Sequence, residues 1–164
     1  MDIFEALAKR CSVRKYENKP VPREILEKLV DAGRRAPSAR AVEPWEFVVV
    51  TDRGTLTELA KIATTGTFIG GAAACIVVFC QETKYYLEDG SAATENILLA
   101  AAGLGLGACW VAGDKKPYAE AVSRVLGAGP GLKLVSLISL GWPGERVSQN
   151  KNRPLKDVLH WEKI

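Results

Sequence analysis

Two basic segments near opposite ends of the chain carry the residues best suited to holding an anionic ligand. Arg10, Ser12 and Arg14 place two guanidinium groups and a hydroxyl close together, and Lys151 and Arg153 form a second pair. The forked donors of arginine match phosphate oxygens, and a phosphate monoester carries about −1.5 to −2 charges. Both segments are therefore candidate phosphate ligands. On these residues alone, however, a charged and solvated helix end is the better explanation of Arg10–Arg14.

Two further segments contain small residues in patterns that suit a ligand. Pro37, Ser38 and Ala39 belong to a loop against whose backbone a planar ligand could lie, although such a loop also simply ends a helix. Gly103–Ala108 matches the relaxed dinucleotide fingerprint G-x-G-x-x-A. That fingerprint requires a strand before the glycines and a helix after them, whereas the sequence predicts a long helix before them. We therefore reject a Rossmann site and interpret the glycines as a helix end.

Other common site chemistries find little support. The single histidine, His160, argues against a hydrolase with a histidine base. No two of the four cysteines are spaced as C-x-x-C, so no metal site is predicted. Cys75, Cys80 and Cys109 lie in apolar stretches and are expected to be buried thiols. Burial could raise the pKa of Glu95 in its apolar helix, but a carboxylate facing a polar partner is the simpler interpretation.

A helical pair is predicted before the first strand. Asp2 can cap the first helix. Its apolar face would consist of Ile3, Phe4, Leu7 and Cys11. Arg10 and Arg14 could reach one point if this helix, or its last turn, continued that far. The second helix opens at Val21–Pro22, and Pro37 ends it because the residue before a proline is disfavoured in the α region.

The remaining pattern predicts a single α+β domain over residues 1–164, with a three- or four-stranded sheet and no regular βαβ alternation. The helix Glu88–Leu106 is apolar nearly all round, so it should be buried in the domain or in a subunit interface. Asp114 is predicted to cap a later helix that Gly127 closes. A short helix over about Leu56–Ala63 and an irregular stretch over Thr64–Gly71 are also expected. The predicted strands are Phe47–Thr51, Cys75–Cys80, which should be covered on both faces, and Leu132–Leu140.

Length and composition are those of an ordinary globular protein. The 164 residues are 48% hydrophobic and 25% charged. A net charge of +3, with basic and acidic residues interspersed, argues against nucleic-acid binding. The longest apolar run, Ile97–Ala112, is interrupted by glycines and is shorter than the roughly 18 residues of a membrane span. The N-terminus does not look like a signal peptide, so we expect a cytoplasmic protein without nucleic-acid or membrane partners.

Five segments, in order and at suitable separations, resemble the motifs of the nitroreductase family of FMN oxidoreductases. Together they cover nearly the whole chain. Arg10–Tyr16 resembles R-x-S-x-R-x-[YF], Ala36–Trp45 resembles A-P-S-x-x-N-x-Q-P-W, Asn96–Trp110 resembles the long central helix and the turn after it, Leu140–Pro143 resembles L-G-x-P, and Lys151–Leu155 resembles K-x-R-P-L.

The resemblance implies a central mixed or antiparallel sheet flanked by helices, and a homodimer with swapped C-terminal tails and FMN at its interface. The phosphate ligands would be Arg10, Ser12, Arg14, Lys151 and Arg153, with Cys11 in the same segment. The partner subunit would line the flavin with Pro37, Ser38, Ala39 and Ala41. The segment beneath or beside the isoalloxazine ring would be Trp110, Val111, Ala112 and Gly113.

The resemblance also implies a ping-pong reaction carried by the flavin, so no catalytic side chain is predicted. NAD(P)H would reduce flavin N5, and a nitroaromatic, a quinone or a related acceptor would then take the electrons. Two features depart from the family pattern. Ala41 and Glu43 replace an asparagine and a glutamine, and the Cys80–Glu88 connection has no room for the helical insertion that often covers the active site. We therefore expect an open flavin face and broad or bulky acceptors.

Three alternatives remain open at this point. The chain could belong to a specialised branch of the family that performs enone reduction, flavin fragmentation or dehalogenation, although dehalogenation needs a lid. It could be a flavin-binding carrier with little turnover, an idea that Ala41 favours. It could also be an interaction domain whose basic residues only decorate the surface.

Overall fold

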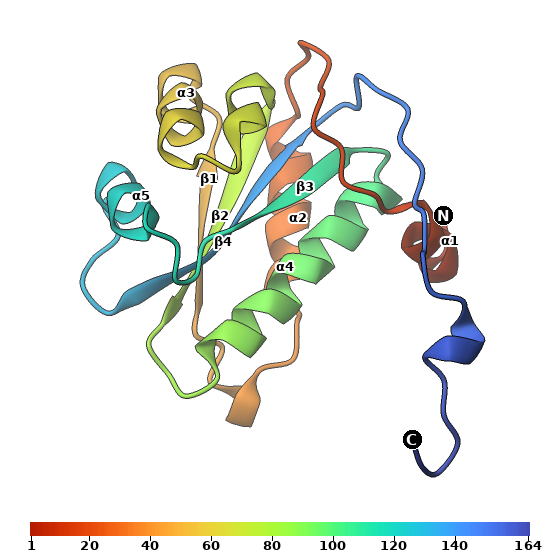
Figure 1. The fold of residues 1–164 in the computed structure, drawn as a ribbon. Helices are drawn as coiled ribbons and strands as arrows, with labels where there is room; N and C mark the ends of the chain where they lie inside the picture. Colours follow the sequence, from red (N-terminus) through yellow and green to blue (C-terminus); the bar gives the residue numbers. More distant parts are fainter.

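The computed structural model describes residues 1–164 as a four-stranded antiparallel sheet with helices on both faces (Figure 1). The strand order is β1-β2-β4-β3, and every neighbouring pair is antiparallel. The α+β prediction is confirmed, with the sheet fully antiparallel. The strands are Trp45–Val50 (β1), Ala74–Gln81 (β2), Gly107–Ala112 (β3) and Leu132–Gly141 (β4).

The central strands hold the core. Every residue of β2 from Ala74 to Cys80 is buried, as its continuous apolar sequence predicts. One core cluster joins the sheet to α2 (Arg23–Arg34) and α4 (Tyr86–Gly103). The other joins its opposite face to α3 (Arg53–Ile62), the 3₁₀ turn η2 (Thr67–Gly71) and α5 (Ala119–Val125). Part of the stretch predicted to be irregular is thus an ordered turn.

The long helix α4 lies across one face of the sheet (Figure 1). It packs closely on α2, because a Cβ on Gly33 would lie 2.9 Å from Ile97 Cδ1. Only one face is fully buried in the single chain, and the rest is half-buried or exposed. The buried residues are Asp89, Gly90, Ala93, Thr94, Ile97, Leu98 and Ala101. None of the helices combines the length and the apolar character needed to cross a membrane.

Two helix predictions were wrong in detail. The first helix, α1 (Ile3–Lys9), has the predicted Asp2 cap, but it buries Ala6 and leaves Ile3, Phe4 and Leu7 exposed. It stops before Cys11, so that residue is not on its face. Asp114 does not cap α5, which begins only at Ala119, because the Asp114 carboxylate accepts a hydrogen bond from the Tyr86 hydroxyl at 2.6 Å.

The C-terminal segment leaves the sheet and passes α1 (Figure 1). Its first part is tied to the N-terminal segment: Gly144 N donates to the Lys15 carbonyl, and Gln149 Nε2 donates to the Arg10 carbonyl at 2.8 Å. From Lys151 to Ile164 every residue is exposed, including the short turn η3 (Leu155–Asp157).

Candidate functional site

The segment that contains Arg10, Ser12 and Arg14 is extended and lies along the outer edge of β3. Ser12 pairs with Ala108 as a parallel bridge, and Val13 N donates to the Ala108 carbonyl at 3.0 Å. Because α1 ends at Lys9, the two arginines do not project from one helix. The helical arrangement considered from the sequence is therefore wrong, and the sheet edge positions these residues instead.

The arginine side chains flank this edge on both sides. Arg10 Nε lies 3.6 Å from Glu95 Oε1 of α4, and the Arg14 guanidinium lies 5.6 Å from the Phe68 ring of η2. Next to Ala108 on β3, the strand that this segment pairs with, is Cys109. Burial raises the pKa of its thiol, while the Arg14 charge, a hydrogen bond with Ser12 and the Arg10 charge oppose that rise. Three of the predicted phosphate ligands thus lie on one segment beside β3.

The backbone of this segment is fixed by residues far away in the chain. The Tyr16 hydroxyl lies 2.7 Å from the Val13 carbonyl and 2.7 Å from Ser139 Oγ of β4, and burial raises the pKa of the phenol. Glu145 Oε1 accepts hydrogen bonds from Arg14 N at 2.9 Å and Lys15 N at 3.2 Å, which lower the pKa of that carboxyl. Because Glu145 occupies these amides, a ligand at this edge would meet the side chains rather than the backbone.

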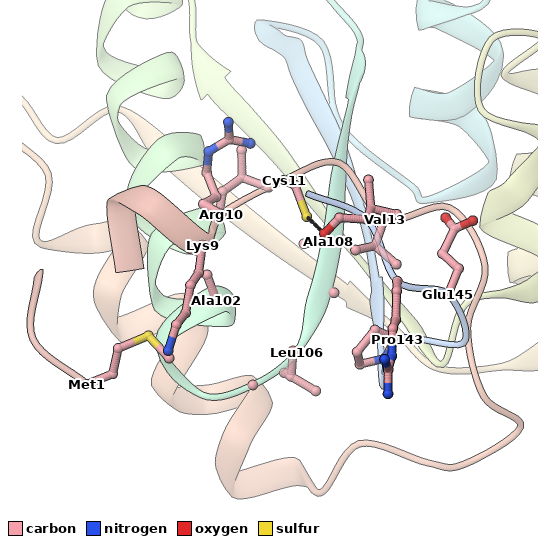
Figure 2. A pocket seen from close by; sticks show the side chains of 15 residues that line it. Met1, Lys9, Arg10, Cys11, Val13, Ala102, Leu106, Ala108, Pro143 and Glu145 are labelled. Atoms are coloured by element: carbon pink, nitrogen blue, oxygen red, sulfur yellow. Dashed lines mark hydrogen bonds between the residues drawn. The ribbon is translucent and has the colours of Figure 1, made fainter. Parts of the chain in front are cut away.

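A cavity of about 290 Å³ lies on the other side of the same segment (Figure 2). Cys11 and Val13 contribute to its wall, and Cys11 Sγ donates to the Val147 carbonyl at 3.3 Å. Figure 2 shows the Arg10 guanidinium and the Lys9 ammonium pointing in opposite directions. Ser12 and Arg14 do not line this cavity, so it is not the place where the three predicted phosphate ligands converge.

The residues of β3 predicted to lie near the flavin ring alternate in exposure. Trp110 and Ala112 are exposed, whereas Val111 and Gly113 are buried. Val111 belongs to the core on the α3 and α5 side of the sheet. Of this group, only the side chains of Trp110 and Ala112 are open to a ligand.

The loop that contains Pro37, Ser38, Ala39 and Ala41 lies elsewhere. Its 3₁₀ turn η1 (Ala39–Ala41) is beside the start of α4, whereas α1 lies beside the later part of that helix (Figure 1). Ala39 N donates to Asp89 Oδ1 at 2.9 Å. One chain therefore does not bring this loop to the Arg10–Arg14 segment.

Lys151 and Arg153 are also separate from the Arg10–Arg14 segment in the single chain. Both are exposed, and Arg153 Nη2 donates to the Asp157 carbonyl within the tail at 2.6 Å. The predicted phosphate ligands therefore form two groups, one on the edge of β3 and one on the tail.

Comparisons with known proteins identify the family. The profile of the nitroreductase family matches residues 7–89 and 67–142. A protein of Archaeoglobus fulgidus, provisionally named NADH dehydrogenase/NAD(P)H nitroreductase, is 35% identical over 164 residues, which cover 94% of each chain. The chain belongs to the nitroreductase family.

Solved structures place the chain within the same nitroreductase fold. A Parabacteroides distasonis protein, provisionally named NADH dehydrogenase/NAD(P)H nitroreductase, superposes with a TM-score of 0.93 at 32% identity, covering 99% of this chain and 98% of its own. An FMN-dependent nitroreductase of Clostridium difficile has a TM-score of 0.92 at 30% identity, covering 98% and 99%.

Several residues that contact the two candidate segments are not marked by any pattern in the sequence. Phe68 faces Arg14, Asp89 binds the loop backbone, and Glu145 and Gln149 hold the N-terminal segment. Their contacts are long-range, and no local pattern marks them. The polar partner considered for Glu95 is Arg10.

Proposed function

We propose that this chain is an FMN-dependent NAD(P)H oxidoreductase that binds the flavin phosphate at the edge of β3. The observation that carries the proposal is the placement of Arg10, Ser12 and Arg14 on the single extended segment that pairs with Ala108 of that strand. The names of the C. difficile and A. fulgidus relatives, an FMN-dependent nitroreductase and an NAD(P)H nitroreductase, support the same cofactor and donor.

The residues at this edge fit a phosphate monoester. Two guanidinium groups balance its charge of about −1.5 to −2, and the Ser12 hydroxyl adds a further donor. Arg10 meets Glu95 through Nε, so its terminal nitrogens can still bind an anion. Lys151 and Arg153 would complete the site if the tail folds back onto Gln149, which already contacts Arg10.

Exposed residues of β3 would position the ring. Trp110 and Ala112 offer apolar surface beside the phosphate ligands, and they would hold one face of the isoalloxazine. The bound flavin supplies hydride transfer from NAD(P)H to an acceptor in two half-reactions. No side chain of the protein needs to act as a nucleophile.

We further propose that residues 1–164 form a single domain that works as a homodimer. The loop Pro37–Ala41 is remote from the phosphate ligands of its own chain, so a second copy would have to supply it. Apolar side chains without cover support an interface. They include Ile3, Phe4 and Leu7 on α1 and Leu155, Val158, Trp161 and Ile164 on the tail.

A groove of about 820 Å³ between α2 and the open edge of β1 is suited to receive the swapped tail of a second copy. Its lining combines apolar residues, among them Leu26, Val30 and Val49, with the ion pairs Arg23–Glu27 and Arg34–Asp31, and would receive a tail that carries both apolar and charged side chains. Deletion of residues 151–164 should therefore convert a dimer to a monomer in sedimentation velocity. A truncated chain that remains dimeric would exclude the tail swap.

The acceptor side of the flavin is expected to be open. Only Glu82–Tyr85 connect β2 to α4, so the chain has no helical cover at this place. This favours broad or bulky acceptors such as nitroaromatics and quinones. The unpaired cysteines Cys75, Cys80 and Cys109 suit a reducing compartment, and we assign the enzyme to the cytoplasm.

The first test of the proposal is the visible absorbance of the purified protein. Purified protein should be yellow, and its flavin absorbance should bleach when NADH or NADPH is added. Arg10→Ala and Arg153→Ala should each weaken FMN retention, whereas Arg124→Ala on the exposed end of α5 should not. A colourless protein that ignores added FMN would contradict the proposal. Full retention by both site variants would contradict the phosphate assignment alone.

A flavin carrier is the second candidate, because Ala41 cannot form a side-chain hydrogen bond to the ring. A yellow protein that neither nucleotide reduces would favour it.

A further inference from the structure

We propose that Asp89 is a positioning residue that holds the loop Pro37–Glu43 in the shape required to line the flavin. The proposal rests on the assignment of this loop to the cofactor in the proposed function. Its structural content, the anchoring of the loop by Asp89, can be tested without flavin.

Asp89 is a buried carboxylate with one partner. It lies in the first turn of α4 and is only 5% exposed. Its Oδ1 accepts the hydrogen bond from Ala39 N at 2.9 Å, while Oδ2 is buried without a hydrogen-bond partner. Such a group is costly to bury, because a polar atom that loses water without gaining a partner is unfavourable. A leucine would fill the same space without this cost, which indicates a role beyond filling the core.

Asp89 does not stabilise α4 as a side-chain cap. The N-cap of α4 is Tyr85, which makes no side-chain capping bond, and the neighbouring acidic residue Glu88 is exposed. The contact of Asp89 is with the loop. Asp89 also lies near the Cys80 thiol. Burial and the Asp89 charge raise the pKa of this thiol to about 12, so it stays protonated and uncharged.

The loop needs an anchor because its backbone is strained. Arg40, Ala41 and Glu43 have φ values of 57°, 53° and 49°, a region that residues other than glycine rarely adopt. Such conformations persist only where the surroundings enforce them. Three residues of this kind within a stretch of four therefore require firm ties.

Most ties of the loop are internal. Glu43 N donates to Ser38 Oγ at 2.9 Å, and Ala41 N donates to the Ser38 carbonyl at 3.1 Å. These bonds define the curl of the loop but do not place it on the body of the protein. Among the hydrogen bonds of residues 37–43, only that from Ala39 to Asp89 reaches outside the loop. Its loss should release the loop while the core stays folded.

Trypsin provides a direct measurement, because Arg40 is an exposed cleavage site inside the loop. Asp89→Leu keeps the core filled and removes the acceptor. Cleavage after Arg40 should then be about tenfold faster or more, since a hydrogen bond to a charged group restrains opening by at least that factor. Glu88→Leu, on the exposed neighbour in the same turn, should be cleaved like the parent. Circular dichroism would verify that both variants are folded.

Asp89→Asn removes the negative charge but keeps a side-chain oxygen that can accept a hydrogen bond. Its side-chain oxygen can still accept from Ala39 N, so we expect cleavage close to that of the parent. Flavin binding should follow the same order, with Asp89→Leu weaker than Asp89→Asn. FMN and riboflavin should be affected equally, because the loop would face the ring and not the phosphate.

The proposal fails if folded Asp89→Leu is cleaved after Arg40 at the parental rate. If that variant does not fold, Asp89→Ala is compared with Asp89→Asn, and equal cleavage of these two would overturn the proposal. These outcomes are independent of the cofactor. If the parent is yellow but Asp89→Leu is cleaved at the parental rate, only the anchoring role of Asp89 is refuted. If the parent is colourless but Asp89→Leu is cleaved faster, only the assignment of the loop to the flavin is refuted.

Discussion

The two chain segments assigned to the cofactor are held in opposite ways. The segment Arg10–Tyr16 is tied to β3, to β4 and to the start of the tail. The loop Pro37–Glu43 is curled by its own bonds and joined to the rest of the protein through Asp89. The comparison indicates that the two segments have different roles in binding the cofactor. A fixed edge would hold the phosphate, and a loop anchored at a single point by Asp89 would present its preformed shape to the ring bound by a second copy.

The largest effect should come from removing a charge at the fixed edge. Arg14→Ala should raise the Kd for FMN about ten- to a hundredfold, because charge-assisted hydrogen bonds contribute about 1.5–3 kcal/mol. Riboflavin, which lacks the phosphate, should bind with little change. Flavin fluorescence titrations measure both constants. An equal loss for FMN and riboflavin would move Arg14 from the phosphate to the ring.

The next largest effect concerns the contribution of the Tyr16 hydroxyl to the stability of the folded protein. Tyr16→Phe removes the hydroxyl shared by the Val13 carbonyl and Ser139, and should lower the free energy of unfolding by about 1–2 kcal/mol. Urea denaturation checks this value, with Tyr85→Phe as the exposed control. If the two variants unfold alike, the network does not stabilise the segment.

A smaller effect is expected in the loop. Ser38→Ala removes the acceptor for Glu43 N and should cost about 0.5–1 kcal/mol, because Ser38 is only half-buried and water can replace the bond. Urea denaturation again gives the value. A cost above that of Tyr16→Phe would reverse the comparison between the two regions.

The smallest effect should be the pH dependence of the fixed edge. Backbone bonds from Arg14 and Lys15 lower the pKa of Glu145 below its ordinary value of 4.5. A depressed pKa stabilises the folded state above that value, and the stabilisation is lost as the pH falls through the folded-state pKa. The difference in Tm between the parent and Glu145→Gln should therefore be present at pH 7 and vanish in acid. A difference that persists in acid would assign it to packing.

The fold was largely predictable from local patterns. The continuous apolar run of β2 and the long apolar helix α4 were both recognisable, because burial on a sheet and helical packing leave such runs. The residues that begin helices were harder to predict from the sequence. Asp114 resembles a cap but has a tyrosine partner, and the apolar face of α1 is not covered by its own chain.

The site was predictable only in its ligand types. The spacing of Arg10, Ser12 and Arg14 alone favoured a charged surface, and the family resemblance made them candidate phosphate ligands. Their geometry depends on contacts such as that between Arg14 and Glu145, which are 131 residues apart. No local pattern encodes such a pair, so the extended course of the segment and the anchoring by Asp89 appear only in the folded chain.

The bridge between Ser12 and Ala108 has a consequence for assembly. It occupies the outer edge of β3 with the protein's own N-terminal segment, and leaves β1 as the open edge of the sheet. A sheet with two open edges can add copies on both sides without limit, as in a fibril. With one edge occupied, growth by edge addition stops once the other is covered. The bridge at Ser12 would thus restrict edge pairing to β1, where two copies could meet without further growth.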